Sequence, residues 1–180
     1  MPAAHILKMI PYDLKKIKAI ALDVDGVLSS SIVNIGPDGQ PIRTANIKDG
    51  YALQLAARHG LHIAIISGGK SAAVQERYAY LGVQHIYMGV AYKTDTFRTW
   101  CAEIGVTPDE VAYMGDDIPD LPVMQICGCP VCPNDAASEV RATALYVSPV
   151  AGGHGCVRDV LEQIMRAHGW WASSDKAFGW

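Results

Sequence analysis

Short apolar runs alternate with segments of helical periodicity along most of the chain. Strand-like segments occur at 17–22, 61–67, 83–87, 111–117 and 144–148, and the almost unbroken apolar run at 61–67 is typical of a parallel strand covered on both faces. Apolar residues at helical spacing predict helices at 46–59, 71–81, about 93–104 and about 157–168. Gly60 and Gly82 are placed to end the first two helices, and Thr107–Glu110 has the form of a helix N-terminus.

This alternation predicts an α/β fold: a Rossmann-like, three-layer parallel sheet with helices on both faces. The chain has 180 residues and is 50% hydrophobic, which suits one domain over 1–180. A Pro-Asp-Gly turn between strand-like pieces predicts a β-hairpin at about 31–46, inserted after the first strand. The last segment, 170–180, shows no period, and we expect a flexible tail there.

Charge and composition exclude several classes of partner. A formal net charge of -3 gives no electrostatic reason to expect nucleic acid or an acidic membrane surface. No long apolar run precedes the first lysines, so we expect neither a signal peptide nor a membrane span, and we expect a cytoplasmic location. We interpret Cys127, Cys129 and Cys132 as small residues of a buried strand, since a zinc site needs a fourth ligand.

Polar residues stand where several predicted strands end. Asp23 and Asp25 follow the first strand, Ser67, Gly68 and Gly69 follow the second, and Gly115, Asp116 and Asp117 follow a later one, while Lys93 opens a helix just beyond another. In parallel sheets, ligands bind beyond the carboxyl ends of the strands. We therefore expect these separate segments to meet at one rim of the sheet.

The chemistry of this set is that of phosphoryl transfer. Clustered carboxylates need a hard cation, and oxygen ligands suit Mg²⁺, which in turn binds phosphate oxygens. A serine beside two glycines exposes backbone N–H groups to a phosphate, and a lysine adds a positive charge. One aspartate can then attack phosphorus while the metal and the lysine neutralise the developing charge.

Four segments, DVDGVL, IISGG, the isolated Lys93 and GDDIPD, resemble the four motifs of the haloacid dehalogenase superfamily of phosphatases. Three longer segments, NIKDGYALQLAARHG, GDDIPDLPVM and GGHGCVRDV, resemble the 3-deoxy-D-manno-octulosonate 8-phosphate phosphatase family within it. The resemblance runs from about Ile17 to His168. It implies a Mg²⁺-dependent phosphatase that hydrolyses a sugar-acid phosphate monoester through an aspartyl-phosphate.

The resemblance also implies a role for each matching residue. Asp23 would be the nucleophile and a Mg²⁺ ligand, and Asp25 the acid and base, with its backbone carbonyl on the metal. Ser67 and Lys93 would hold the transferring phosphoryl group. Asp116 would bind the metal directly, and Asp117 directly or through water. Asp120 would fix the surrounding loop.

Substrate recognition is implied less directly. Gly68, Gly69, Lys70, Arg77 and Asn46 are the candidate substrate-binding residues. Many relatives carry an arginine where this chain has Gly69, and Lys70 would take part of that role. Arg77 would meet the substrate's carboxylate, even from a neighbouring subunit, although an ordinary solvated helix charge is the alternative. The loop Gly152–Gly155 would either fold over substrate, with His154 or Arg158, or be a plain connector.

The resemblance implies that this hairpin stands in place of the full cap domain of larger relatives. In the resembling family the hairpins associate around a tetramer, so we expect a homotetramer whose neighbouring subunits cover each active site. Two alternatives stay open: the substrate would be a nine-carbon 2-keto sugar acid 9-phosphate, or the protein would be a receiver-type phospho-acceptor domain. An inactive scaffold is disfavoured, because no motif position expected for chemistry has been replaced. The receiver is disfavoured because its phosphorylated aspartate lies on a different strand from its acidic pair, whereas Asp23 and Asp25 lie together.

Overall fold

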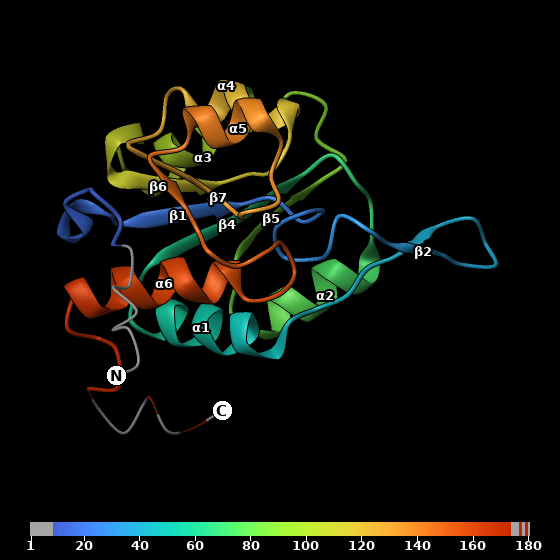
Figure 1. Ribbon diagram of the computed structural model, residues 1–180. Helices are drawn as coiled ribbons and strands as arrows, with labels where there is room; N and C mark the ends of the chain where they lie inside the picture. The colour runs from blue at the N-terminus through green and yellow to red at the C-terminus, as the bar shows by residue number, and fades with distance from the viewer. Residues whose placement is uncertain (1–8, 174–176, 178, 180) are drawn as a thin grey trace, which may run out of the picture.

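The computed structural model describes residues 9–173, 177 and 179. Its centre is a six-stranded sheet in the order β5-β4-β1-β6-β7-β8, with every neighbouring pair parallel (Figure 1). The strands are β1 (Ala19–Leu22), β4 (His62–Ser67), β5 (His85–Met88), β6 (Val111–Met114), β7 (Cys129–Cys132) and β8 (Tyr146–Val147). The chain leaves β1 to one side and later returns to its other side, so the strand order reverses at β1.

Two layers of helices cover the sheet. On one face lie α1 (Ile47–Arg58), α2 (Ala72–Tyr80) and α6 (Cys156–Ala167), and on the other lie α3 (Lys93–Ile104), α4 (Leu121–Met124) and α5 (Ser138–Thr143) (Figure 1). All four residues of β1 are buried because both faces are covered, which explains its unbroken apolar sequence. The predicted three-layer α/β fold is confirmed.

Local differences from the predicted elements are small. Thr107–Glu110 does not open a longer helix: Pro108–Glu110 forms a single 3₁₀ turn, η2, because β6 starts directly at Val111. The Glu110 carboxylate does bond back, accepting a hydrogen bond from Thr107 N at 3.1 Å. The other 3₁₀ turns are η1 (Leu14–Lys16) and η3 (Ile118–Asp120).

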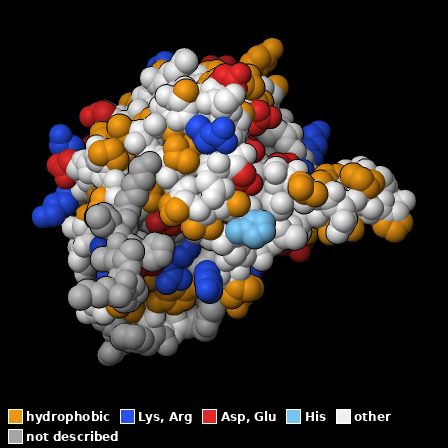
Figure 2. All heavy atoms as spheres, viewed as in Figure 1, with side chains coloured by type: hydrophobic (Ala, Val, Ile, Leu, Met, Phe, Trp, Pro, Cys, Tyr) orange, Lys and Arg blue, Asp and Glu red, His pale blue; other side chains and the backbone are white. Residues whose placement is uncertain are grey.

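A two-stranded hairpin, β2 (Asn34–Ile35) with β3 (Pro41–Ile42), follows β1 and projects from the domain (Figures 1 and 2). Thr44 N donates to Ser29 Oγ at 3.0 Å, and this bond ties the returning chain to the segment that leaves β1. Ser29 is 1% exposed, so the base of the hairpin is fixed to the core. The hairpin lies inside the range expected from the sequence.

The described part of the C-terminal segment packs on the domain. Trp170 stacks with the rings of both His59 and His168, and Arg158 Cζ lies 4.3 Å from the ring centroid of Trp171. The expected flexibility therefore does not apply to these two tryptophans, whose large apolar rings cover core residues. The expectation also covers residues 174–176, 178 and 180, which lie outside the described residues.

Cys129 and Cys132 are the first and last residues of the buried strand β7, as predicted, and Cys127 lies just before this strand. Within residues 9–173, 177 and 179, no helix is both long and apolar enough to cross a membrane.

Candidate active site

The carboxyl ends of β1, β4 and β6 open onto one cavity of about 420 Å³. The residues that line it come from four separate segments of the chain: Asp23, Asp25 and Ser31; Ser67, Gly68 and Gly69; Val90, Ala91 and Lys93; and Asp116, Asp117 and Pro119. The segments predicted to meet at one rim of the sheet are thus together, beside the strand where the order reverses.

Asp23 is fixed at the centre of this cavity. Its backbone N–H donates to Met114 O at 3.0 Å, which extends the pairing of β1 with β6 by one residue. Its Oδ1 accepts from Val24 N at 2.7 Å, and its Oδ2 lies 2.7 Å from Lys93 Nζ. The Asp23 side chain is 11% exposed, so its orientation is set by these contacts rather than by solvent.

Lys93 links two buried carboxylates. It is the first residue of α3, and its Nζ lies 2.7 Å from both Asp23 Oδ2 and Asp120 Oδ1. Its side chain is 6% exposed. Tyr113, on β6, donates its hydroxyl to the same Asp120 oxygen at 2.6 Å. A buried tyrosine needs a partner for its hydroxyl, and Asp120 provides it.

Asp120 also orders the loop after β6. Its Oδ2 accepts from Asp116 N at 3.0 Å and from Asp117 N at 3.2 Å. Asp117 Oδ1 in turn caps η3 by accepting from Ile118 N at 2.8 Å. Four hydrogen bonds occupy the two oxygens of Asp120, and it is 0% exposed. Its contacts are those of a group that orients its neighbours, as the sequence predicts.

The acidic cluster is electrostatically strained. Burial and the charge of Asp120 raise the pKa of Asp23 to about 6, although Lys93 opposes the rise. Burial, together with the charges of Asp23 and Asp120, raises the pKa of Asp116 to about 8. Burial alone would lower the pKa of Lys93, but the two carboxylates raise it above its ordinary value. One positive side chain does not neutralise this group.

The geometry fits a divalent cation. Single carboxylate oxygens of Asp23, Asp116 and Asp120 lie within 4.8 Å of one another. Because Asp120 is already saturated with hydrogen bonds, Asp23 and Asp116 are the pair that can offer oxygens to an ion, with Asp117 at the edge of the same cavity. The donor set is oxygen only, which suits Mg²⁺.

Ser67, at the end of β4, faces the same cavity. Its Oγ accepts from Gly69 N at 3.2 Å, and the residue is 1% exposed. Gly68 and Gly69 line the cavity beside it, so the turn presents small residues and backbone to a ligand.

Asp25 has a partner that the sequence analysis missed. Arg43, which follows β3, donates from Nε to Asp25 Oδ1 at 2.7 Å and from Nη2 to Oδ2 at 2.8 Å. No motif or spacing in the sequence identifies Arg43 as a partner of Asp25. Arg43 lies in the hairpin insertion, and it contacts Asp25 only because the hairpin folds back onto the domain. Tyr113 was missed too; a tyrosine in a fully buried strand was the available signal.

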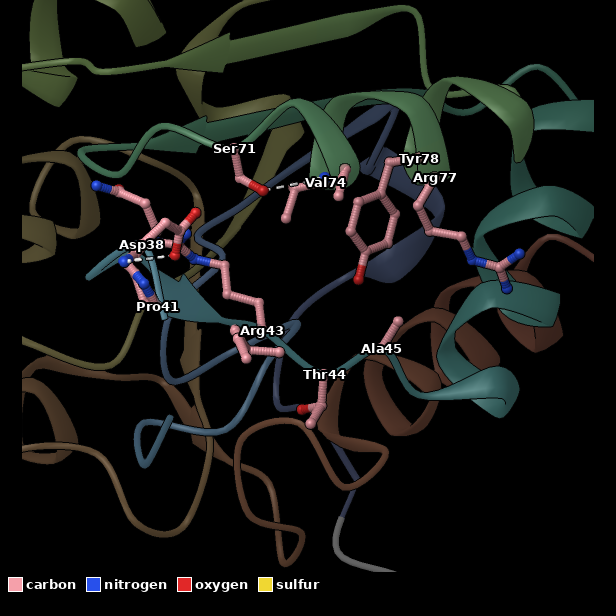
Figure 3. Close-up of a pocket in the computed structure, with 12 residues that line it drawn as sticks. Asp38, Pro41, Arg43, Thr44, Ala45, Ser71, Val74, Arg77 and Tyr78 are labelled. Carbon is pink, nitrogen blue, oxygen red and sulfur yellow. Dashed lines mark hydrogen bonds between the residues drawn. The ribbon is translucent and has the colours of Figure 1, made fainter. Parts of the chain in front are cut away.

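The remaining candidates lie farther out. Asn46 caps α1, accepting from Lys48 N at 2.9 Å. The methylenes of Lys70 pack over Gly89. Arg77 lines a second cavity, between the hairpin and α2, but its guanidinium extends toward Gly50 of α1 (Figure 3). The structure does not bring Arg77 together with the aspartates within this chain.

The glycine-rich loop 152–155 is anchored rather than free. Gly153 N donates to Val27 O at 2.8 Å, and Gly152 N donates to Asp135 Oδ1 at 2.9 Å. The ring of His154 lies 2.7 Å from Gly152 O, and Arg158 pairs with Glu162 and stacks on Trp171. The loop packs against the segment that follows Asp25.

Comparisons with known proteins agree with this geometry. The haloacid dehalogenase-like hydrolase family matches residues 82–159. The chain is 37% identical over 155 residues to the 3-deoxy-D-manno-octulosonate 8-phosphate phosphatase of Escherichia coli, a match that covers 86% of this chain and 82% of that protein.

Solved structures give the same result. The 3-deoxy-D-manno-octulosonate 8-phosphate phosphatase of Yersinia pestis superposes with a TM-score of 0.83 at 32% identity, covering 93% of this chain and 87% of that one. The corresponding enzyme of Moraxella catarrhalis, solved with magnesium, phosphate and KDO, gives 0.83 at 33% identity, covering 88% and 91%. This chain belongs to the haloacid dehalogenase-like hydrolases, in the group that contains these phosphatases.

Proposed function

We propose that this protein is a Mg²⁺-dependent phosphatase of a sugar-acid phosphate monoester, namely 3-deoxy-D-manno-octulosonate 8-phosphate. The observation that carries the proposal is the meeting of Asp23, Lys93 and Asp116, from three distant segments, at one cavity. The similarity to the E. coli and M. catarrhalis phosphatases supports the choice of substrate.

In the first step Asp23 attacks phosphorus, an aspartyl-phosphate forms, and the bond from phosphorus to the sugar oxygen breaks. Asp25 gives its proton to the leaving oxygen. Ser67 and the backbone of Gly68 and Gly69 contact the phosphoryl oxygens, and Lys93 holds Asp23 in line while balancing charge.

In the second step water attacks the aspartyl-phosphate, and Asp25 takes the proton that the water loses. The bond from phosphorus to Asp23 breaks, inorganic phosphate leaves, and the Asp23 carboxylate is restored. Asp25 ends protonated, which restores the acid that the first step uses.

Asp23 and Asp116 would hold the magnesium ion, with the Asp25 carbonyl and Asp117 as further candidates. When bound, the ion supplies positive charge next to the phosphoryl oxygens and the acidic cluster. The raised pKa values of Asp23 and Asp116 support this assignment, because two buried carboxylates at this distance need a counter-charge to be ionised together.

Phosphate release from a panel of sugar phosphates, with Mg²⁺ and with a chelator, tests the proposal. We expect fast, Mg²⁺-dependent release from the eight-carbon acid 8-phosphate. Asp23→Asn should abolish turnover without unfolding the protein, whereas Asp109→Asn, an exposed change, should retain it. Equal slow release from every substrate would contradict the sugar-acid assignment, and substantial activity of Asp23→Asn would contradict the assigned nucleophile.

The alternatives left open by the sequence are not favoured. A receiver-type domain or an inactive scaffold does not fit a chain whose relatives are phosphatases and which keeps Asp23, Asp25, Ser67 and Lys93. The nine-carbon 9-phosphate belongs in the same panel; faster release from it would replace the eight-carbon assignment.

We also propose that four copies assemble through the hairpin, so that neighbouring subunits cover each active site. Exposed isoleucines on and beside the projecting arm support this: Ile32 is 86% exposed, Ile35 69% and Ile42 54% (Figure 2). In such an assembly Arg77 would act on a neighbouring subunit's substrate. The cytoplasmic location stays a prediction.

A further inference from the structure

Arg43 joins the base of the hairpin to the carboxylate that serves as acid and base. Its two bonds to Asp25, at 2.7 and 2.8 Å, form the paired geometry in which a guanidinium binds a carboxylate most specifically. The Arg43 side chain is only 7% exposed, whereas that of Asp25 is 44% exposed. A guanidinium this buried is held in place before any ligand arrives.

The surroundings reserve space for this guanidinium. The neighbouring residue, Thr44, is bonded through its backbone N–H to buried Ser29, which fixes where Arg43 starts. At the other end, a Cβ on Gly69 would lie 2.4 Å from Arg43 Nη2 and 3.3 Å from Asp25 Oδ2. Any side chain at position 69 would therefore displace the guanidinium from Asp25.

Arg43 also borders a second cavity, of about 290 Å³, between the hairpin and α2. Figure 3 shows Arg43 crossing this cavity, with Thr44 on one side, Ser71 and Tyr78 on the other, and Arg77 extending away. Arg43 thus borders the catalytic cavity through Asp25 and Gly69, and its own side chain lines the second cavity.

The ion pair between Asp25 and Arg43 conflicts with the role of Asp25 as acid and base. To serve a leaving oxygen or a water, Asp25 must turn an oxygen toward the phosphate, yet both of its oxygens face Arg43. A carboxylate on the substrate resolves this conflict, because it offers Arg43 the same two acceptors. Two charge-assisted hydrogen bonds break and two form. The freed Asp25 carboxylate takes from solvent the proton that it then gives to the leaving oxygen, and it returns this proton to solvent when it pairs with Arg43 again.

We propose that Arg43 is a specificity residue that binds the substrate's carboxylate and, in doing so, releases Asp25 for the reaction. The inference rests on the proposed function and deepens it, since it gives the acidic end of the substrate a partner within this chain, in addition to the Arg77 expected from a neighbouring subunit. The contact with Asp25 shows that the guanidinium can bind a carboxylate at this place. A neutral sugar phosphate offers no replacement and leaves Asp25 bound to Arg43.

The test compares two substrates that differ only at the carboxylate: the octulosonate 8-phosphate and its C1 amide. We expect the wild type to favour the acid by about 10- to 100-fold in kcat/KM, because an unmatched buried charge is what rejects the amide. Arg43→Met should lower kcat/KM for the acid to near the level of the amide. For the amide, the same variant should be as fast as wild type or faster, since Asp25 is no longer held.

Controls separate this role from a general loss of structure. Arg98→Met, an exposed arginine of α3, should keep the wild-type preference. Inhibition by inorganic phosphate should be unchanged in Arg43→Met, because phosphate binds at Ser67 and Lys93. Should Arg43→Met fold poorly, Gly69→Ala displaces the guanidinium without altering Arg43, and it should also narrow the preference.

The possible results distinguish a failure of this inference from a failure of the proposed function. An equal fall for acid and amide in Arg43→Met, or a wild type that turns over both equally well, overturns the inference while leaving the phosphatase assignment intact. A wild type that releases phosphate from other esters but from neither of these two overturns the proposed substrate, and the inference with it.

Discussion

The carboxylate of Asp116 lies directly against the backbone of Gly26. A Cβ at position 26 would be 1.8 Å from Asp116 Oδ2, and the φ of Gly26 is +82°, in the left-handed region that favours glycine. Two distant motifs therefore fit together only because residue 26 has no side chain. The glycine that follows Asp25 is thus a requirement of the metal site as well as of the turn.

Gly26→Ala should consequently disable the site. We expect Asp116 to be pushed out of reach of a shared cation, with a loss of about 100-fold or more in kcat/KM and a weakened response to Mg²⁺. Gly60→Ala is the matched control, since Gly60 has a φ of +87° and no atom within 4 Å of an added Cβ. It should cost about 1 kcal/mol of stability from backbone strain alone and retain activity. Comparable activity of the two variants would refute the packing argument.

Lys93 should stabilise the fold as well as the reaction. Lys93→Met leaves Asp23 and Asp120 buried side by side without their counter-charge, so in the absence of Mg²⁺ we expect a loss of about 3–5 kcal/mol in the free energy of unfolding. Adding Asp120→Asn removes one of the two charges and should recover about 1–3 kcal/mol of that loss. Urea unfolding of the two single variants and the double variant measures this coupling, and strict additivity would contradict it.

The parts of this site that could be predicted from sequence are those governed by strand ends. Asp23, Ser67 and Asp116 each follow an apolar run, and parallel strands bring their carboxyl ends to one edge. Lys93 could be placed because it opens a helix just beyond a strand. For these residues the local sequence pattern and the sheet topology agree, so the order of the motifs along the chain was enough to predict that they meet.

The parts that could not be predicted depend on contacts across irregular segments. The pairing of Arg43 with Asp25 depends on how the hairpin returns to the domain, and the bond from Tyr113 to Asp120 depends on the path of the η3 turn. Neither contact is indicated by a periodic pattern or a motif in the sequence. Trp170 and Trp171 fall in a segment without pattern, yet their rings find apolar surface on α1 and α6.

Mg²⁺ should stabilise the protein in a pH-dependent manner. The pKa values of Asp23 and Asp116 are raised to about 6 and about 8, so without a cation ionising them costs stability as pH rises above their unfolded values. A cation offsets this cost, and protons compete with it at low pH. We therefore expect the rise in Tm on adding Mg²⁺ to be larger at pH 8 than at pH 5 in a thermal melt. Asp116→Asn should remove most of the effect, and an undiminished effect would place the ion elsewhere.

The hairpin isoleucines should control assembly. Ile35→Asp puts a charge on an exposed apolar position of the arm and should reduce the mass measured by light scattering from four copies to a smaller species. Tyr80→Asp is the matched control, because Tyr80 is an equally prominent apolar residue, 77% exposed, on α2. It should leave the mass unchanged. A wild type that is monomeric at micromolar concentration would contradict the tetramer.

Asp49 provides a pH dependence separate from the metal site. It is 1% exposed in α1, its Oδ1 accepts from Arg158 N at 2.6 Å, and its Oδ2 has no hydrogen-bond partner. Burial raises its pKa to about 6, despite the opposing effect of Arg158. The folded state thus holds a proton that the unfolded chain releases near its ordinary value, so stability is lost as pH rises from about 4 to about 6.

Asp49→Asn should reverse this loss. The amide oxygen keeps the bond to Arg158 N, while the buried charge disappears, so the variant should gain on wild type as pH rises, by up to about 2–3 kcal/mol between pH 4 and pH 8. Urea unfolding of both proteins at each pH measures the difference, and contributions from the acidic cluster cancel because both proteins carry it. Parallel stability curves would mean that Asp49 ionises without penalty, and that water or a shift of α6 reaches its second oxygen.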